Sequence, residues 1–301
     1  MSEPLVVVVG AAGKLGRLVV QAVLEHPGAR VRALVRDPRK PEVQGLAGPR
    51  VELLAFDATT ATDTERAAAV AGSYAVVSTL QGGPDVIVDA QLALIRAAKA
   101  AGARRFIPSD FSYNVMTLPE GININSDWRR TLAVKARDEV TPSFEVVHVF
   151  QGIFTDKHVL GFLGMFDGQT LRYWGDGTTP IDWTTWEDTA AFTAAAALDE
   201  RPVPEHLFVR GDRLDVLSFA RTWETAHGRK LAMERLGSLE DLVTETRRRL
   251  AAEPQNMFAW LPLMYAQGMY SGKALLGELH NQRYPEIRPA TVAQAIAQGA
   301  V

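Results

Sequence analysis

The chain has 301 residues, 47% of them hydrophobic and 22% charged, a composition typical of a globular protein that can bury a sizeable core. The 32 Lys and Arg residues nearly balance 35 Asp and Glu, so the formal charge of −3 gives no general attraction to nucleic acid or anionic lipid. The absence of cysteine excludes disulfides, thiolate metal sites and a cysteine nucleophile. No apolar run approaches the ~20 residues of a membrane span, and the N-terminus begins as a strand rather than a signal peptide. We therefore expect a soluble, cytoplasmic protein without nucleic-acid or membrane partners.

Short β-branched runs alternate with helical stretches in the first half of the chain. The apolar run Leu5–Val9 is typical of a strand buried on both faces, and apolar residues at helical spacing follow it until Pro27 and Gly28. This alternation predicts parallel βαβ units with right-handed crossovers. The expected strands are Leu5–Val9, Val31–Val35, Val51–Phe56, Ala75–Leu80, Arg105–Pro108 and Phe144–Val149, with an alanine-rich helix over Asp85–Ala101.

The composition changes after about Gly152, where aromatic residues, Met and Gly become frequent. The sequence predicts an α/β fold in which residues 1–152 form a Rossmann-type doubly wound parallel sheet. Residues 153–301 are expected to form a smaller, mainly helical substrate-binding region, from which the segment near 187–209 returns to the first domain. The expected elements of this half are a helix over Glu187–Leu198, a strand over His206–Val209, and helices over Ser218–His227, Leu239–Ala251 and Phe258–Ser271.

A glycine-rich loop joins the first strand to the first helix. Gly10, Gly13 and Gly16 form a G-x-x-G-x-x-G pattern in the strand–turn–helix context that dinucleotide binding requires. Gly10 permits the tight turn, Gly13 lets the backbone approach a pyrophosphate at the helix N-terminus, and Gly16 allows the helix to pack closely on the strand. The loop residues expected to bind a dinucleotide are Gly10, Ala12, Gly13, Lys14, Leu15 and Gly16.

The end of the second strand bears on the choice between NAD and NADP(H). An acidic residue there usually binds the ribose of NAD, whereas an arginine suits the 2′-phosphate of NADP(H). Arg36 takes this position and Arg39 and Lys40 follow, which favours NADP(H) with Arg36 and Lys40 at the phosphate. Asp37 leaves the alternative open, because it would be the ribose-binding acid if the strand ended one residue later.

Other candidate residues follow the ends of later strands, at the sheet edge where ligands bind in this fold. Thr79, Leu80 and Gln81 follow the fourth strand and are expected near the cofactor ribose. Asp57 follows the third strand and either lies near the adenine or caps the next helix. His148 is either a proton relay or an ordinary buried residue. The scattered histidines show no metal-binding spacing, so no metal is expected.

Several segments together resemble the NmrA-like group of atypical short-chain dehydrogenases, and within it the isoflavone reductase and phenylcoumaran benzylic ether reductase type. The glycine loop, residues 34–38 (Leu-Val-Arg-Asp-Pro) and residues 105–111 (Arg-Phe-Ile-Pro-Ser-Asp-Phe) carry the resemblance. The family motif at the last of these is Pro-Ser-Glu-Phe, so this chain has Asp110 where the family has Glu. Further similar segments are residues 148–154, 175–177, 186–190 and 218–230, so the resemblance covers nearly the whole chain.

The resemblance implies an NADPH-dependent reductase that transfers hydride to an aromatic, phenolic substrate such as a phenylpropanoid, lignan or isoflavone. It implies that Ser109, Asp110 and Phe111 lie at the cofactor, and that the segment with Phe150 and Phe154 lines the nicotinamide and substrate region. The usual Tyr-x-x-x-Lys pair of short-chain dehydrogenases is absent. The family's helical lysine matches Lys135, which would then lie at the cofactor and act as the general acid or base.

Three alternatives remain open from the sequence. Lys135 is otherwise an exposed helix residue that pairs with Asp138 or Glu139. Some NmrA-like proteins sense the redox state of the dinucleotide and act through protein partners without turnover. A quinone reductase would share the fold and differ only in substrate. The sequence also leaves a homodimer open.

Overall fold

The computed structural model describes residues 3–301 of the chain. The chain forms two compact units, and each is assembled from three stretches of sequence. The first unit comprises the residues up to Phe111, then Trp128–Val149 and Thr189–Leu207. The second comprises Ser112–Asp127, Phe150–Asp188 and Phe208–Val301.

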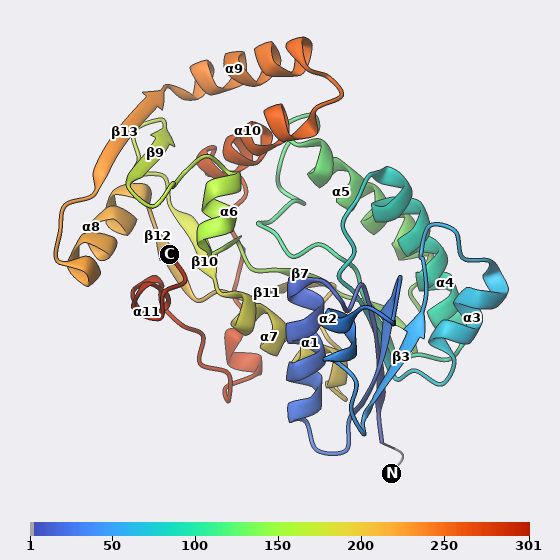
Figure 1. Ribbon diagram of the computed structural model, residues 1–301. Coiled ribbons are helices and arrows are strands. Elements are labelled where there is room, and N and C mark those ends of the chain that lie inside the picture. The colour runs from blue at the N-terminus through green and yellow to red at the C-terminus, as the bar shows by residue number, and fades with distance from the viewer. Residues whose placement is uncertain (1–2) are drawn as a thin grey trace. The chain divides into compact units, whose positions relative to one another are not determined.

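A six-stranded parallel sheet forms the centre of the first unit (Figure 1). Its strand order, β3-β2-β1-β4-β5-β6, is that of the Rossmann fold, which confirms the predicted fold class. Apolar residues on both faces of the central strands are buried, as expected for a parallel sheet that helices cover on both sides. The strands are β1 (Leu5–Val9), β2 (Arg30–Val35), β3 (Val51–Ala55), β4 (Ala75–Ser78), β5 (Arg105–Ile107) and β6 (Glu145–Val146).

Helices lie on both sides of this sheet. The helix α1 buries an apolar stripe against one side, whereas α3 and α4 pack together on the other (Figure 1). The predicted helix over Asp85–Ala101 begins with a π-helical turn before it becomes regular. The helical elements are α1 (Lys14–Glu25), α2 (Pro41–Gln44), α3 (Asp63–Val70), η1 (Asp85–Ala90), α4 (Gln91–Ala100), α5 (Ile124–Ala136), η2 (Arg137–Glu139) and α7 (Trp186–Leu198).

The predicted sixth strand, Phe144–Val149, is wrong in its extent. Only β6 pairs with β5, and the chain changes partners at Val147. The amide of Val147 still donates to the carbonyl of Phe106, at 3.0 Å, but the amide of His148 donates to the carbonyl of Glu205, at 2.7 Å. The residues after Val147 therefore form a separate strand, β7 (His148–Phe150), which pairs with β11 (His206–Phe208).

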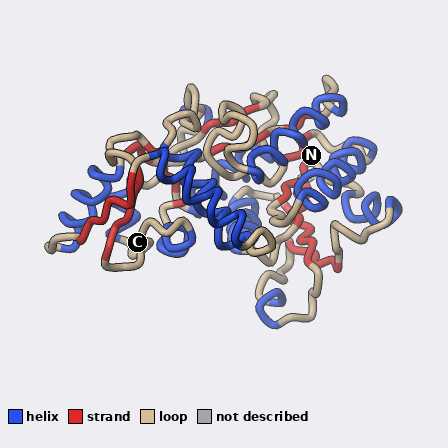
Figure 2. Tube along the Cα trace, turned by 90° about the horizontal axis from the view of Figure 1, so that it is seen from above, coloured by secondary structure: helices blue, strands red, loops and turns tan. Residues whose placement is uncertain are grey.

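The second unit combines two small sheets with helices. The strand β10 (Ile181–Thr184) lies between β8 (Ile153–Phe154) and β12 (Asp212–Leu214), and β9 (Thr170–Trp174) pairs in parallel with β13 (Ala232–Gly237). Figure 2 shows the β9–β13 pair as adjacent red segments. Sequence analysis does not predict the strands β8, β9, β10, β12 and β13. The helical elements are α6 (Lys157–Phe162), α8 (Val216–His227), α9 (Leu239–Ala252), α10 (Met257–Tyr270), η3 (Asn281–Arg283) and α11 (Val292–Ala297).

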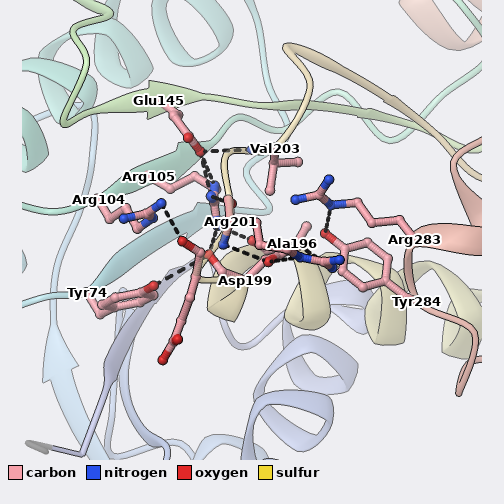
Figure 3. A network of polar contacts seen from close by, with 11 residues as sticks. Tyr74, Arg104, Arg105, Glu145, Ala196, Asp199, Arg201, Val203, Arg283 and Tyr284 are labelled. Atoms are coloured by element: carbon pink, nitrogen blue, oxygen red, sulfur yellow. Dashed lines mark hydrogen bonds and ion pairs between the residues drawn. The ribbon is translucent and has the colours of Figure 1, made fainter.

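A buried arginine joins the last stretch of the first unit to its sheet (Figure 3). Arg105 of β5 is fully buried and donates through Nε to the Glu145 carboxylate of β6, at 2.8 Å. Its remaining N–H groups donate to the carbonyls of Ala196, Asp199 and Arg201, at and just beyond the end of α7. The last carbonyls of a helix have no partner within the helix. The guanidinium supplies donors to them in addition to the Asp199 amide, which donates to Ala196, and the Tyr74 hydroxyl, which donates to Asp199.

We expect Arg105→Met to lower the free energy of unfolding by about 3 kcal/mol, because it removes the buried ion-pair partner of Glu145 and the guanidinium donors to three carbonyls. Arg96→Met is the matched control. Arg96 also pairs with a glutamate, Glu139, but its side chain is 62% exposed, so its loss should cost less than about 1 kcal/mol. Urea denaturation of both variants measures the difference, and equal losses would contradict the structural role of Arg105.

Candidate functional site

The glycine loop brings the start of α1 close to the sheet. Gly10 has a φ of +79°, a conformation that favours glycine, and its amide donates to the carbonyl of Leu34, at 3.1 Å. Gly13 is the N-cap of α1 and offers no capping side chain. An uncapped helix start presents N–H groups and a positive partial charge, which together suit a phosphate group.

Gly16 is required by contact with the loop itself. A Cβ atom at this position would lie 2.5 Å from the carbonyl oxygen of Gly10 and 2.8 Å from the Cα of Ala11. Both are backbone atoms, which cannot move aside as a flexible side chain could. The backbone therefore shapes the loop at the start of α1, and its role in binding a pyrophosphate stays a prediction.

The turn after β2 contains Asp37, which the sequence left open as a ribose-binding acid. The Asp37 carboxylate accepts hydrogen bonds from the amide and Nε of Arg39, both at 3.0 Å. Arg36 and Lys40 are exposed, and among residues 3–301 neither side chain forms a hydrogen bond or ion pair. Asp37 thus neutralises Arg39, whereas Arg36 and Lys40 keep their charges available for an anion.

Asp57, after β3, stabilises its own turn. Its carboxylate accepts hydrogen bonds from the hydroxyl of Thr59, at 2.6 Å, and from the Thr59 amide, at 3.0 Å. These bonds and the nearby charge of Arg36 hold the pKa of Asp57 below its usual range. The alternative that Asp57 caps the next helix is wrong, because Thr62 caps α3 in a reciprocal pair with Glu65.

Side chains link the carboxyl ends of β1, β4 and β5. The Thr79 hydroxyl donates to the carbonyl of Val9, at 2.9 Å, and the Ser109 hydroxyl donates to the carbonyl of Leu80, at 2.6 Å. Gln81 follows Leu80 and is exposed. The residues predicted after the fourth and fifth strands therefore lie along the same sheet edge as the glycine loop.

A buried acid–histidine pair follows β5. One oxygen of Asp110, Oδ2, lies 2.6 Å from Nδ1 of His148, and both side chains are 1% exposed. The other oxygen, Oδ1, is buried and has no hydrogen-bond partner in the described chain. His148, weighed from the sequence as a proton relay or a core residue, is buried, so its contact with Asp110 is internal.

Arg129 is a site residue that the sequence analysis missed. It is buried, and its Nε donates to the carbonyls of Ser109 and Asp110, at 3.1 and 3.2 Å. It therefore holds the backbone beside Phe111, which has a φ of +31° and is the one non-glycine residue with positive φ among residues 3–301. The only sequence signal was an arginine in a helix that follows this motif, which is too common to single out.

The predicted acid–base residue Lys135 lies in the last turn of α5 with its side chain exposed. The residues of α5 that are buried nearby are Leu132, Ala133 and Ala136, so Lys135 is on the solvent side of the helix. Its suggested ion pair with Glu139 does not form, because Arg96 and Lys99 hold that carboxylate. Among residues 3–301, Lys135 forms no hydrogen bond or ion pair with Ser109 or Asp110.

The predicted residues Phe150 and Phe154 belong to the second unit. Phe150 is buried and stacks on Phe208, with ring centroids 5.8 Å apart. Phe154 is also buried and lies flat against Trp186, with centroids 3.5 Å apart and an interplanar angle of 9°. Both therefore serve at least as packing residues of that unit.

The model of the NmrA-like family matches residues 2–290. The chain belongs to the NmrA-like family. Its relatives include a bifunctional pinoresinol-lariciresinol reductase from Linum usitatissimum, 25% identical over 255 residues that cover 79% of each chain. The structure of AtPrR2 with NADP+ and (+)-pinoresinol has a TM-score of 0.80 at 20% identity and covers 99% of both chains. A leucoanthocyanidin reductase–NADPH complex from Vitis vinifera has the same TM-score and identity and covers 98% of both.

Asp110 is the position at which this chain departs from the family motif. The resemblance assigns a glutamate to this motif position, and the shorter Asp110 side chain here meets the imidazole of His148.

Within residues 3–301, no group of three or more His, Asp or Glu residues has a metal-binding arrangement, and no helix is long and apolar enough to cross a bilayer.

We expect Gly16→Ala to lower the free energy of unfolding by about 1–3 kcal/mol, since its methyl group overlaps backbone atoms of the loop. Gly13→Ala is the matched control. Gly13 has an ordinary φ of −70°, and its added Cβ would come no closer than 3.4 Å to the Gly10 carbonyl. Its effect should remain below about 1 kcal/mol. Chemical denaturation of both variants tests the close approach, which an unchanged Gly16→Ala protein would disprove.

Proposed function

We propose that this protein is an NADPH-dependent reductase that transfers hydride to a small aromatic, phenolic compound. The observation that carries the proposal is the backbone-shaped glycine loop together with the unpaired cations Arg36 and Lys40. The names of the family members above support the same chemistry, since they are reductases of lignan and flavonoid compounds, and two of the structures contain NADP+ or NADPH.

The residues of the first unit fit this cofactor part by part. The start of α1 would bind the pyrophosphate, because Gly10 and Gly16 keep side chains out of the space beside it. The Arg36 guanidinium matches the geometry of a 2′-phosphate, and Lys40 adds a second charge. Asp37 would not bind the ribose, since its carboxylate is held by Arg39. NADPH supplies the hydride when bound, and the protein positions the two reactants.

We expect Arg36→Ala to weaken NADPH binding about tenfold to a hundredfold, because it removes a charge-assisted hydrogen bond to the 2′-phosphate. Binding of NADH, which lacks this phosphate, should be unaffected. Arg39→Ala is the control, since Arg39 is already paired with Asp37. Calorimetric titration of each protein with both cofactors measures the dissociation constants. A parallel loss for NADH and NADPH would contradict the 2′-phosphate assignment.

We assign the proton transfer of this reaction to Lys135. Reduction of the substrate consumes one hydride from NADPH and one proton, and produces NADP+ and the reduced compound. Lys135 matches the helical lysine of the family in sequence, and its side chain forms no ion pair among residues 3–301. The ammonium group in contact with the substrate oxygen would donate the proton while hydride arrives at carbon, and the neutral amine that remains would take up a proton again from water.

We expect Lys135→Ala to lower kcat at least about a hundredfold, the usual contribution of a general acid or base, while the dissociation constant for NADPH stays the same. NADPH oxidation is measured against a panel of isoflavones, lignans, phenylcoumarans and quinones. Lys230→Ala is the control, because Lys230 is also exposed but is paired with Glu224. Full activity in Lys135→Ala would remove the acid–base assignment and leave the reductase intact.

A redox sensor is the second candidate function, and the exposure of Lys135 favours it. A sensor needs the cofactor site but no acid–base residue beside it. Tight NADPH binding without oxidation by any compound of the panel would support the sensor over the reductase.

A further inference from the structure

The second unit contains an open pocket of about 460 Å³, which lies within the usual size of a small-molecule site. Its walls come from the first residues of α6, the turn at residues 166–168, and the end of α8 with the residues that follow. The side chains that matter here are Lys157, Asp167, Trp223, His227 and Arg229. All belong to one compact unit, and the glycine loop belongs to the other.

A buried tryptophan orders one wall of this pocket. Trp223 is 2% exposed, and the imidazole of His227 stacks on it with centroids 4.0 Å apart. The guanidinium of Arg229 also packs over the indole, with its Cζ 4.7 Å from the ring centroid. His227 Nδ1 donates to the carbonyl of Trp223, at 3.0 Å, so Nε2 is left to meet a ligand. Arg229 and His227 are thus held in place before any ligand arrives.

The pocket has two cations without ion-pair partners in the described part of the chain, whereas its Asp167 carboxylate is held by neighbouring groups. Among residues 3–301, neither Lys157 nor Arg229 forms an ion pair. Asp167 accepts hydrogen bonds from the amides of Gln169 and Thr170 and from Arg172, at 2.7–2.9 Å. These bonds lower the pKa of Asp167 to about 2, so the carboxylate is ionised and is held by Arg172, which also pairs with Glu234. Val301, which also lines the pocket, makes no ion pair with either cation.

We propose that this pocket of the second unit binds a small organic phosphate. Arg229 would hold the phosphate group through its planar fork, and Lys157 would add a point charge. A phosphate group alone fills only part of the pocket, so the organic part of the ligand occupies the remainder beside His227. This inference does not depend on the proposed reductase activity.

The test is calorimetric titration of the full chain with phenyl phosphate in the presence of saturating NADP+, which keeps the probe from any cofactor site. Arg229→Gln and Lys157→Gln should each weaken binding about tenfold, because each removes a charged contact with the phosphate. Lys230→Gln should bind as the unaltered protein does, because Lys230 neighbours Arg229 in sequence but is paired with Glu224. NADP+ affinity should be the same in all four proteins.

Three results would overturn the proposal. The first is no binding of phenyl phosphate, and the second is equal affinity of all four proteins for it. The third is binding of phenol with the same affinity as phenyl phosphate. A phosphate on a lipid offers the same chemistry, so vesicles that contain phosphatidic acid form a separate arm. Co-sedimentation that depends on Arg229 and Lys157, without phenyl phosphate binding, would replace the small molecule by a membrane surface. Loss of NADP+ binding alone would count against the reductase and not against this pocket.

Discussion

The first unit depends on one buried arginine. Residues 189–207 join the Rossmann sheet from far along the chain, and the part of α7 in this stretch is almost wholly buried. A buried helix has a cost at its C-terminus, where carbonyl groups lack donors. Arg105 supplies these donors and balances its own charge with Glu145 on the neighbouring strand. A lysine could not do the same, because it lacks the planar array of five N–H groups.

The opposite end of the strands carries the residues that we propose to bind the cofactor. There the backbone rather than side chains shapes the space, since Gly16 touches the Gly10 carbonyl and Thr79 closes the loop from β4. Nearby, Arg129 and the Asp110–His148 pair hold the segment after β5, where Phe111 has an unusual backbone conformation. Strain of this kind persists only where surrounding bonds enforce it. Arg105 thus stabilises one end of the sheet, and the residues that we propose to bind the cofactor lie at the other end.

Charge pairing distinguishes the two anion sites that we infer. In the turn after β2, Asp37 takes up Arg39 and leaves Arg36 and Lys40. In the second unit, Asp167 is held by Arg172, which also pairs with Glu234, and Lys157 and Arg229 form no ion pair among residues 3–301. In both places a carboxylate beside several cations bonds to one of them, so the other cations remain available for an anion although the overall charge is −3.

The sequence by itself determined the Rossmann sheet and the glycine loop, because buried parallel strands and tight turns impose local patterns that survive in any surroundings. It also placed the four longest helices of the second half, α7, α8, α9 and α10, to within about two residues, but did not predict α6, η3 and α11. Only the tertiary structure decided that Phe144–Val149 divides at Val147, that Asp37 bonds to Arg39, and that Asp110 meets His148. It also decided the exposure of Lys135 and the strands of the second unit. These features depend on partners distant in the chain or on competition between neighbouring charges, and neither leaves a periodic pattern in the sequence.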